Sequence, residues 1–247
     1  MDRLLELTSQ AEASHFWFRG FRQFVSPLVQ RAVAGRSGLT LLDCGCGTGY
    51  NLRTLLAPHG AAYGMDLTAA GLQIARRTGR PLTRADATRI PFKSATFDVV
   101  TSFDMLQCVT DDGAAVAEII RVLKPGGYFA GTVAALNVLH GDHSVLSEEV
   151  RRYTRGGLVS LLQAKGLEPL VARYAFASLF PLLLGVRIVQ RARGAHAAGR
   201  EITVPPAPVN AALSVLVSGE AAIARAVPMP FGSSVVFLAQ KRTRPPK

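Results

Sequence analysis

The chain has 247 residues, 49% of them hydrophobic and 18% charged, and its 28 lysines and arginines against 17 acidic residues give a formal net charge of +11. This composition excludes a disordered or fibrous chain, which is poor in apolar residues or compositionally repetitive. Three cysteines are too few for a disulfide framework and predict a reducing compartment.

Strand-like runs alternate with amphipathic stretches from about residue 39 to residue 133. The runs that have the composition of strands are 39–43, 61–66, 81–86, 97–103 and 128–133. Strands that alternate with helices in this way predict parallel strands joined by right-handed crossovers. The predicted fold class is therefore α/β, with an open sheet.

The helices between and after these strands have recognisable faces and ends. Two sets of residues each share one helical face: Leu52, Leu55 and Leu56, and Val116, Ile119, Ile120 and Leu123. Asp111 and Asp112 are natural N-caps for the second helix, and the prolyl-glycyl-glycine at 125–127 is expected to end it. Thr154 is the expected cap of a further helix over 154–165.

We expect a single domain over residues 1–240. It comprises a helical cap (1–35), an α/β core (38–174), a helical insert (175–234) and a last strand (235–240), followed by a basic tail (241–247). The insert is expected to hold two apolar helices around a proline-rich linker at 202–208.

No segment resembles a signal peptide or a membrane-spanning helix. The N-terminus has an early acid, Asp2, and no uninterrupted apolar stretch. The longest convincing apolar run, 174–186, has 13 residues, whereas a spanning helix needs about 20. We therefore predict a cytoplasmic protein.

The segment LLDCGCGTGYNL (41–52) follows the first strand and opens the next helix. Gly45, Gly47 and Gly49 let the backbone turn sharply and approach a ligand, and Asp43 ends the strand just before them. Asp66 ends the second strand, where an acid accepts both hydroxyls of a ribose. Dinucleotide folds prefer G-x-G-x-x-G, whereas this chain has G-x-G-x-G, and Asp43 would repel a pyrophosphate. The pattern favours S-adenosylmethionine, which carries an ammonium group and a ribose but no phosphate.

The stretch 39–133 resembles the class I S-adenosylmethionine-dependent methyltransferases of the small-molecule type. The matching segments are LLDCGCGTGY (41–50), GMDLT (64–68), ADATRIPFKSATFDVV (85–100) and AEIIRVLKPGGYF (117–129). The flanks resemble a narrower group associated with envelope or glycan genes, through HFWFRGFRQFV (15–25), EEVRRYTRGGLVSLLQAKGLE (148–168) and PMPFGSSVVFLAQKR (228–242). The resemblance implies a Rossmann-like sheet of seven strands in the order 3-2-1-4-5-7-6.

The resemblance also implies roles for the residues that match the family's motifs. Asp43 should hold the methionine amino group, and the three glycines should line the methionine and the ribose. Asp66 should bind the ribose hydroxyls, with Leu67 beside the adenine. Asp86 should accept the adenine amino group, with Ala87 next to it. The backbone around Phe103 should close over the sulfonium side. The alternative interpretation of Asp86 is an ordinary turn residue.

The proton acceptor of the reaction is not obvious from the sequence. Relatives often carry a Glu-His pair after the fourth strand, where this chain has Gln107 and Cys108. An alcohol acceptor needs a base, whereas an acidic phenol or carboxylate does not. His143, in the loop after the fifth strand, is the best candidate, with His140 second, and a solvated loop histidine is the alternative. Two histidines in a loop are weak evidence for a metal, so we predict none.

Residues on the flanks are candidates for contacts with the acceptor. Arg152 and Tyr153 are placed to grip a phosphate or carboxylate, with helix-start surface residues as the alternative. Phe18 and Arg19 are expected to fold over the bound ligands, with core packing of an amphipathic helix as the alternative.

The basic and apolar C-terminal third predicts the kind of partner. Residues 171–247 carry 10 basic residues and only two acids. Arg187, Arg191 and Arg193 gather at the end of the first apolar helix of the insert. The two helices could pack on the core, form a homodimer or contact an anionic membrane and a lipid-linked acceptor, and we favour the last. The alternatives for the whole chain are a nucleic-acid methyltransferase, which we disfavour, and a cofactor-binding protein without catalysis.

Overall fold

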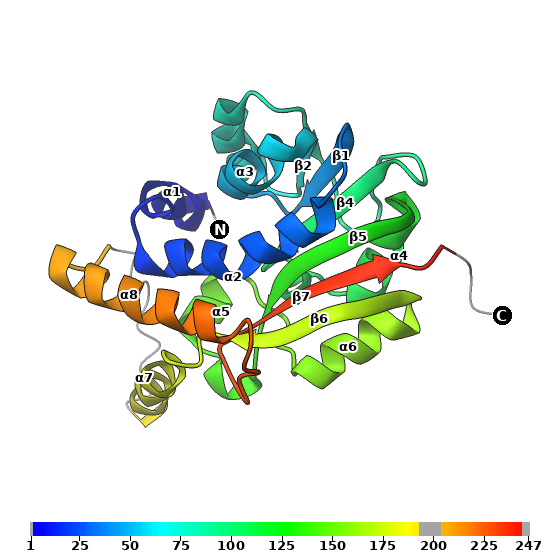
Figure 1. Ribbon diagram of the computed structural model, residues 1–247. Helices are drawn as coiled ribbons and strands as arrows, with labels where there is room; N and C mark the ends of the chain where they lie inside the picture. Colours follow the sequence, from blue (N-terminus) through cyan, green and yellow to red (C-terminus); the bar gives the residue numbers. More distant parts are fainter. Residues whose placement is uncertain (1, 193–203, 244–247) are drawn as a thin grey trace.

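A seven-stranded sheet forms the centre of the molecule (Figure 1). The computed structural model describes residues 2–192 and 204–243. The strands are β1 (Leu39–Cys44), β2 (Gly60–Asp66), β3 (Leu82–Arg84), β4 (Phe97–Phe103), β5 (Leu123–Ala134), β6 (Leu167–Ala175) and β7 (Ser234–Lys241). They lie in the order β3-β2-β1-β4-β5-β7-β6, which confirms the predicted order. β7 pairs antiparallel with both β5 and β6, and the other pairs of strands are parallel.

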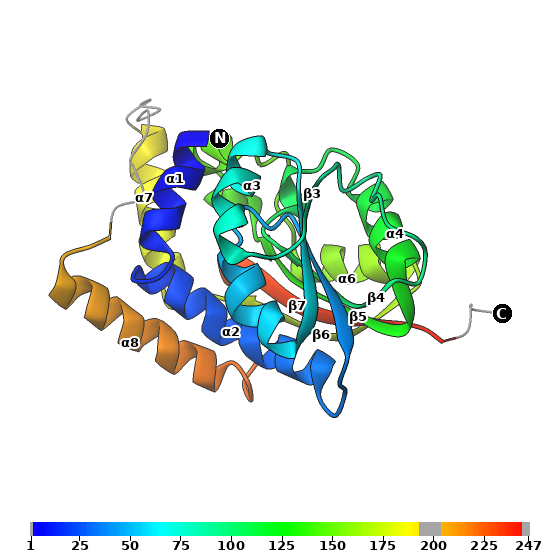
Figure 2. The ribbon, with the colours of Figure 1, turned by 90° about the horizontal axis from the view of Figure 1, so that it is seen from above.

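Helices cover both faces of the sheet. They are α1 (Asp2–Ala11), α2 (Phe16–Val33), α3 (Ala69–Ala75), α4 (Asp112–Val122), α5 (Asp142–Leu146), α6 (Arg155–Ala164), α7 (Phe180–Ala192) and α8 (Ala207–Ile223). Figure 2 shows α2 and α8 side by side on one face and α4 and α6 on the other.

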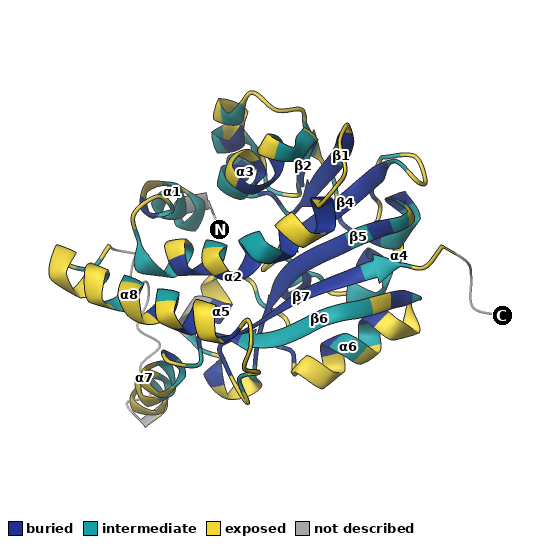
Figure 3. Ribbon diagram, in the orientation of Figure 1, coloured by how far each residue is buried: buried dark blue, intermediate teal, exposed yellow. Residues whose placement is uncertain are grey.

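The strands alternate between two hydrophobic cores, one on each face of the sheet. Leu41 and Val99 belong to the core under α2 and α8, whereas Leu42 and Val100 belong to the core under α4 and α6. Figure 3 shows the central strands buried over nearly their whole length. A strand buried on both sides has apolar side chains at consecutive positions, which is the pattern of LTLLD and FDVVTSF.

The predicted helix caps are confirmed. Asp111 accepts a hydrogen bond from the backbone N–H of Ala114 at 2.8 Å, and Thr154 accepts one from Gly157 at 3.0 Å. The helix predicted around Leu52 is present as a π-helical turn, Leu52–Leu56, which buries Leu52, Leu55 and Leu56 and continues as a 3-10 turn, Ala57–His59. The start of β5 was predicted five residues too late: the strand begins at Leu123, directly after α4, and runs through the prolyl-glycyl-glycine.

A buried carboxylate holds α8 against the segment that follows β6. Glu220 of α8 is 7% exposed and accepts hydrogen bonds from the backbone N–H groups of Ala177 and Ser178. A Cβ at Gly20 would lie 2.3 Å from Val217, so α2 and α8 approach closely at this glycine. No helix in the described part of the chain has the length and apolar character to cross a membrane.

Candidate active site

The glycine-rich loop after β1 adopts a conformation that requires glycine. Gly45 and Gly49 have φ angles of +82° and +79°, in the left-handed region that disfavours side chains. A Cβ at Gly45 would lie 2.6 Å from the side chain of Met105, and one at Gly49 would lie 2.9 Å from Ala75. The loop therefore passes tightly between the end of β4 and α3.

Asp66 fastens this loop to the end of β2. One carboxylate oxygen accepts the backbone N–H of Gly47 at 2.7 Å, and the other accepts the backbone N–H and hydroxyl of Thr68 at 2.8 and 2.6 Å. Leu67, the next residue, is 60% exposed. Asp66 thus presents a half-buried carboxylate beside the glycine loop, where it can accept further hydroxyl donors.

Asp43 is a buried carboxylate at the base of the loop. It is 1% exposed, and one of its oxygens accepts the hydroxyl of Thr101 at 2.8 Å. Burial raises the pKa of Asp43 to about 7, although the Thr101 hydrogen bond opposes the rise, and the negative charge of Asp66 adds to it. A buried carboxylate of this kind is stabilised in its charged form by a bound cation.

The residues expected around the adenine and the sulfonium lie beyond Asp66 and Asp43. Asp86 accepts the backbone N–H and the hydroxyl of Thr88, both at 2.8 Å, and these hydrogen bonds hold the pKa of Asp86 below its usual range. Ala87 is buried in the core. The ring of Phe103 packs edge-to-face on Phe21 with 5.4 Å between centroids. Their contacts with a ligand stay predictions.

The N-terminal helix lies over the glycine loop. The hydroxyl of Thr48 donates to the carboxylate of Glu12, 2.6 Å from the nearer oxygen, and Arg22 donates to the carbonyl of Glu12 at 2.7 Å. Burial raises the pKa of Glu12 to about 7, although the Thr48 hydrogen bond opposes the rise. A Cβ at Gly47 would lie 3.8 Å from Leu5 of α1. Figure 2 shows α1 between α3 and α7.

A cavity of about 550 Å³ adjoins the loop at the carboxyl ends of the parallel strands. Its apolar walls come from α1, the start of α2, the segment after β5, and α7: Leu4, Leu5, Trp17, Phe18, Leu139 and Leu183. Its polar side chains include Asp104, Gln107, Glu149 and Arg152. An open α/β sheet binds ligands at this edge, so the cavity is the candidate acceptor site.

Two carboxylates at this cavity were missed by the sequence analysis. Asp104 follows β4, has a left-handed φ of +54°, and accepts the hydroxyl of Thr132 at 2.9 Å. Glu149 forms an ion pair with Arg152 at 3.1 Å. The signal available for Asp104 is its place directly after the fourth strand, three residues before Gln107.

The other predicted contact residues are dispersed. Phe18 and Arg152 line the cavity, and Arg19 is exposed. The Tyr153 hydroxyl is enclosed and donates to Asp112 at 2.6 Å. The side chain of His143, in α5, lies outside the described ones.

His140 is exposed, and the described residues hold no group that would bind a metal ion. Cys44 and Cys46 are buried free cysteines.

The comparisons with known proteins agree with this arrangement. Residues 42–131 match the family model "Methyltransferase domain". A phthiotriol/phenolphthiotriol dimycocerosates methyltransferase of Mycobacterium ulcerans is 38% identical over 105 residues, which are 39% of this chain and 38% of that enzyme. A demethylmenaquinone methyltransferase of Roseiflexus sp. is 34% identical over 161 residues, 62% of this chain and 66% of the relative. The chain thus spans less than two fifths of the length of the mycobacterial relative.

Solved structures show the same fold. Phosphoethanolamine N-methyltransferase 2 of Haemonchus contortus, in complex with S-adenosylmethionine, superposes with a TM-score of 0.65 at 18% identity, over 98% of this chain and 57% of that chain. The [4+2]-cyclase SpnF superposes with a TM-score of 0.60 at 23% identity, over 89% and 80%. Because one of these proteins is a cyclase, the fold alone does not determine the reaction.

Proposed function

Since the chain belongs to the class I S-adenosylmethionine-dependent methyltransferase family, we propose that it transfers a methyl group from S-adenosylmethionine to a small, lipid-like acceptor. The observation that carries this proposal is the pair of carboxylates at the glycine loop, Asp43 and Asp66, together with a separate cavity of about 550 Å³ that neither carboxylate lines. Leu5 of α1 connects the two, since it lines the cavity and lies 3.8 Å from a Cβ placed at Gly47.

The residues at the loop fit S-adenosylmethionine. Asp43 is a buried carboxylate whose charged form an ammonium group would stabilise, and Asp66 has the acceptor capacity that ribose hydroxyls require. The left-handed glycines leave no side chain at positions 45, 47 and 49 of the loop. When bound, S-adenosylmethionine supplies an activated methyl group on a sulfonium sulfur. The chain's own contribution is to orient the acceptor and exclude water, and α1 covers the loop from the solvent side.

The proposed activity is tested first by cofactor binding. Asp66→Ala is expected to weaken the binding of S-adenosylmethionine by about 1–3 kcal/mol, because charge-assisted hydrogen bonds to the ribose and to the loop are lost. Titration calorimetry measures the change, and Glu168→Ala, at an exposed position of β6, is the matched control. Wild-type protein that binds NAD tightly and does not respond to S-adenosylmethionine would rule out the proposal.

A lipid-like acceptor is supported by the relatives and by the walls of the cavity. Dimycocerosates and demethylmenaquinone, named in the two relatives, are lipid-like molecules. The leucines and aromatic rings of α1, α2 and α7 offer such a molecule an apolar surface. A nucleic acid has less to contact there, because α1 and α7 flank the cavity. The intact Asp43, Asp66 and Asp86 argue against the alternative of a catalytically silent protein that binds the cofactor only for stability.

We also propose that the protein works in the cytoplasm at the inner face of a membrane, with α7 as the contact. Leu182, Val186 and Val189 lie on one stripe of α7 and are 62%, 39% and 48% exposed. The cavity-lining residues of α7, Leu183 and Arg187, lie on another stripe. An apolar stripe on the helix that borders the cavity is suited to a lipid surface.

The arginines predicted to contact lipid have other partners. Arg187 donates to the carbonyl of Leu139 at 3.1 Å, and Arg191 donates to the carbonyl of Val138 at 2.8 Å. Arg193 lies outside the described residues. Reversing the charge of these side chains would release the segment after β5 from α7, so it is no test of lipid contact. Monomer and homodimer both stay open for the oligomeric state.

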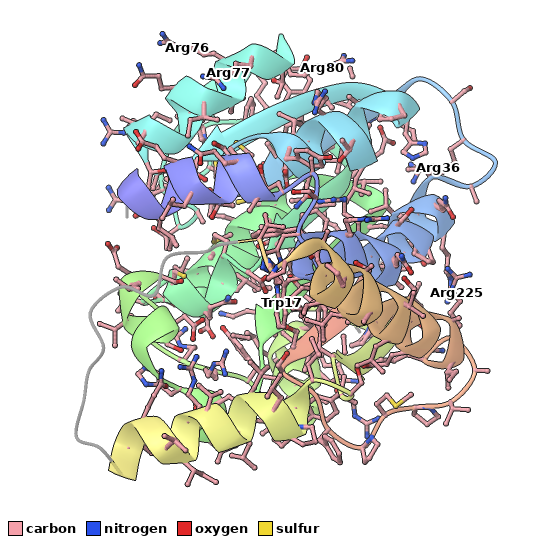
Figure 4. The ribbon with its side chains drawn as sticks, turned by 90° about the vertical axis from the view of Figure 1, so that its left-hand side faces the viewer. Trp17, Arg36, Arg76, Arg77, Arg80 and Arg225 are labelled. Carbon is pink, nitrogen blue, oxygen red and sulfur yellow. The ribbon has the colours of Figure 1, made fainter. Side chains whose placement is uncertain are left out.

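Membrane contact is tested by co-sedimentation with anionic vesicles. The uncharged triple variant Leu182→Ser, Val186→Ser and Val189→Ser is expected to lose at least half of the vesicle-bound fraction, because it removes apolar area without changing charge. The comparison variant reverses the charge of Arg76, Arg77 and Arg80, which lie at the opposite edge of Figure 4 from α7 (yellow). If only this second variant releases the protein, the contact lies at the turn after α3 and the proposal for α7 is wrong.

A further inference from the structure

Asp104 is the carboxylate at the cavity for which the described residues form no ion pair, although the nearby charge of Arg152 acts to lower its pKa. Asp104 is exposed, and its side chain lines the cavity. Glu149, the other carboxylate, is paired with Arg152. Within residues 2–192 and 204–243, Asp104 makes no ion pair, and its hydrogen bonds come from neutral side chains, Thr132 and Gln107. A carboxylate that lines a cavity and forms no ion pair is suited to accept a proton or a hydrogen bond from a ligand.

The surroundings of Asp104 fix its position beside the cofactor loop. Its backbone N–H donates to the carbonyl and to the hydroxyl of Thr132, both at 3.1 Å, while that hydroxyl donates to the Asp104 carboxylate. Gln107 is held by the backbone N–H of Ala134, which donates to its Oε1 at 3.2 Å. The next residue, Met105, packs against Gly45. Asp104 therefore lies where the acceptor cavity meets the glycine loop, and it is held there at a left-handed φ.

The charges around the cavity indicate a neutral acceptor. The charged side chains described there are Asp104, Glu149, Arg152 and Arg187, so two negative and two positive groups face the same space. With two groups of each sign around it, the cavity offers neither an anionic nor a cationic acceptor a net attraction that would offset the loss of its hydration. A neutral hydroxyl group has no charge to bury in this cavity, and it can donate a hydrogen bond to Asp104.

From this geometry we propose that the acceptor atom is the oxygen of a neutral hydroxyl group, and that Asp104 holds this hydroxyl and takes its proton. The proposal rests on the proposed methyltransferase function. In the transfer, the hydroxyl oxygen gains the methyl carbon and its proton passes to Asp104, while the electron pair of the broken carbon–sulfur bond stays on sulfur. The products are a methyl ether and S-adenosylhomocysteine, and Asp104 returns its proton to solvent.

The pKa of Asp104 suits this role. Enclosure by protein raises the pKa of Asp104, and the hydrogen bond from Thr132 opposes the rise. The negative charge of Glu149 raises it further. A carboxylate whose pKa is raised toward the working pH is a better general base than one at its ordinary value. Thr132 and Gln107 are positioning residues for this base.

The acceptor atom is tested by the chemistry of a labelled product. The wild type is incubated with a bacterial lipid extract and S-adenosylmethionine labelled in the methyl group. We expect label in the lipid fraction that survives mild alkali and is released as methyl iodide by hot hydroiodic acid, as a methyl ether requires. Release as methanol by alkali indicates an ester, and resistance to both treatments indicates carbon or nitrogen methylation. Each of these last two results would overturn the hydroxyl proposal and leave the methyltransferase function intact.

The role of Asp104 is tested with its isosteric variant. Asp104→Asn is expected to lower label transfer by about 100-fold or more, because the proton acceptor is lost. Calorimetry should show unchanged binding of S-adenosylmethionine. Asp104→Glu should recover part of the rate and displace the acidic limb of the pH profile, which a merely structural role would not move. Full transfer by Asp104→Asn would exclude the residue as the base.

A binding experiment supplies a readout that needs no turnover. Trp17 lines the cavity and is the single tryptophan of the chain, so its fluorescence reports occupancy (Figure 4). Octyl glucoside, octylamine and octyl phosphate, each below its micelle concentration, present a hydroxyl, a cation and an anion on the same apolar tail. We expect octyl glucoside to bind best and Asp104→Ala to weaken it several-fold, with Glu168→Ala unchanged. Tighter binding of either charged probe contradicts a neutral acceptor, even if S-adenosylmethionine binds as proposed.

Discussion

Asp43→Asn is expected to abolish detectable binding of S-adenosylmethionine and, at pH 8, to make the protein more stable. Burial raises the pKa of Asp43 from 3.8 to about 7. The folded state therefore favours the protonated carboxyl. The stability that this protonated form contributes is complete below about pH 4 and is lost as the pH rises through about 7. Asparagine cannot ionise, so it removes that loss. The same substitution removes the negative charge that we assign to the methionine ammonium group.

The size of the stabilisation follows from the shift. One pKa unit corresponds to about 1.4 kcal/mol, and 1 kcal/mol moves the midpoint of thermal unfolding by roughly 2–4 °C in a domain of this size. Allowing for solvent relaxation around a buried carboxylate, we expect an increase of roughly 5 °C at pH 8 and little change at pH 4. Scanning calorimetry at both pH values measures it, with Glu168→Gln as control. A lower midpoint at pH 8 would contradict the assignment.

The wild type should show the counterpart of this effect in its cofactor affinity. An ammonium ligand needs the ionised form of Asp43, which has to be generated below pH 7. Affinity for S-adenosylmethionine is therefore expected to fall by up to about tenfold for each pH unit below 7 and to level off above it. Titration calorimetry across pH 5.5–8.5 in two buffers of different ionisation enthalpy would reveal the released proton.

Phe176→Ala is expected to produce the largest loss of stability. Phe176 is 1% exposed, stacks on Trp17 with 4.1 Å between centroids, and lies 5.1 Å from the ring of Phe24. It joins α2 to the segment between β6 and α7, so its removal opens a cavity between the helical cap and the insert. Truncations of this kind cost about 3–5 kcal/mol. The left-handed φ of +60° at this position strains phenylalanine and alanine alike, since both bear a Cβ, so backbone strain does not contribute to the expected loss.

Two readouts separate the effects of Phe176→Ala. The midpoint of thermal unfolding should fall by roughly 10 °C, and the emission of Trp17 should shift to longer wavelength as its stacking partner disappears. Phe176→Leu, which keeps most of the volume, should retain over half of the stability. A loss below about 1 kcal/mol for Phe176→Ala would show that the stacked pair is not the joint between the two regions.

Local sequence patterns predicted the strands well because the apolar residues of each strand reflect its burial between the two layers of helices. The strand at 97–103 has its predicted bounds, and the caps at Asp111 and Thr154 depend only on residues within one turn. The start of β5 was misplaced because proline and glycine ordinarily end elements, whereas here Gly126 takes a left-handed φ of +75° inside the strand. The strand order came from the family resemblance, since composition does not specify how parallel strands are ordered.

The cavity was beyond the reach of such patterns because its lining comes from segments far apart in the sequence. Asp104 gains its significance only when α1, the segment after β5, and α7 enclose it. Arg187 and Arg191 illustrate the reverse error: they look like a free basic cluster in the sequence, but carbonyl groups of residues 138–140 bind them. Charge runs indicate partners only after intramolecular acceptors have been counted.

Leu5 of α1 both packs over the glycine loop at Gly47 and lines the acceptor cavity. In the proposed function, the same helix therefore borders both the cofactor loop and the acceptor cavity. A displacement of α1 that releases S-adenosylhomocysteine would break the Thr48–Glu12 hydrogen bond and would expose the acceptor cavity to solvent at the same time. Exchange of the two ligands is coupled by this geometry, which favours an ordered sequence in which the cofactor enters before α1 settles and the acceptor follows. Slow product departure, and with it strong inhibition by S-adenosylhomocysteine, is the kinetic signature of such a coupled exchange.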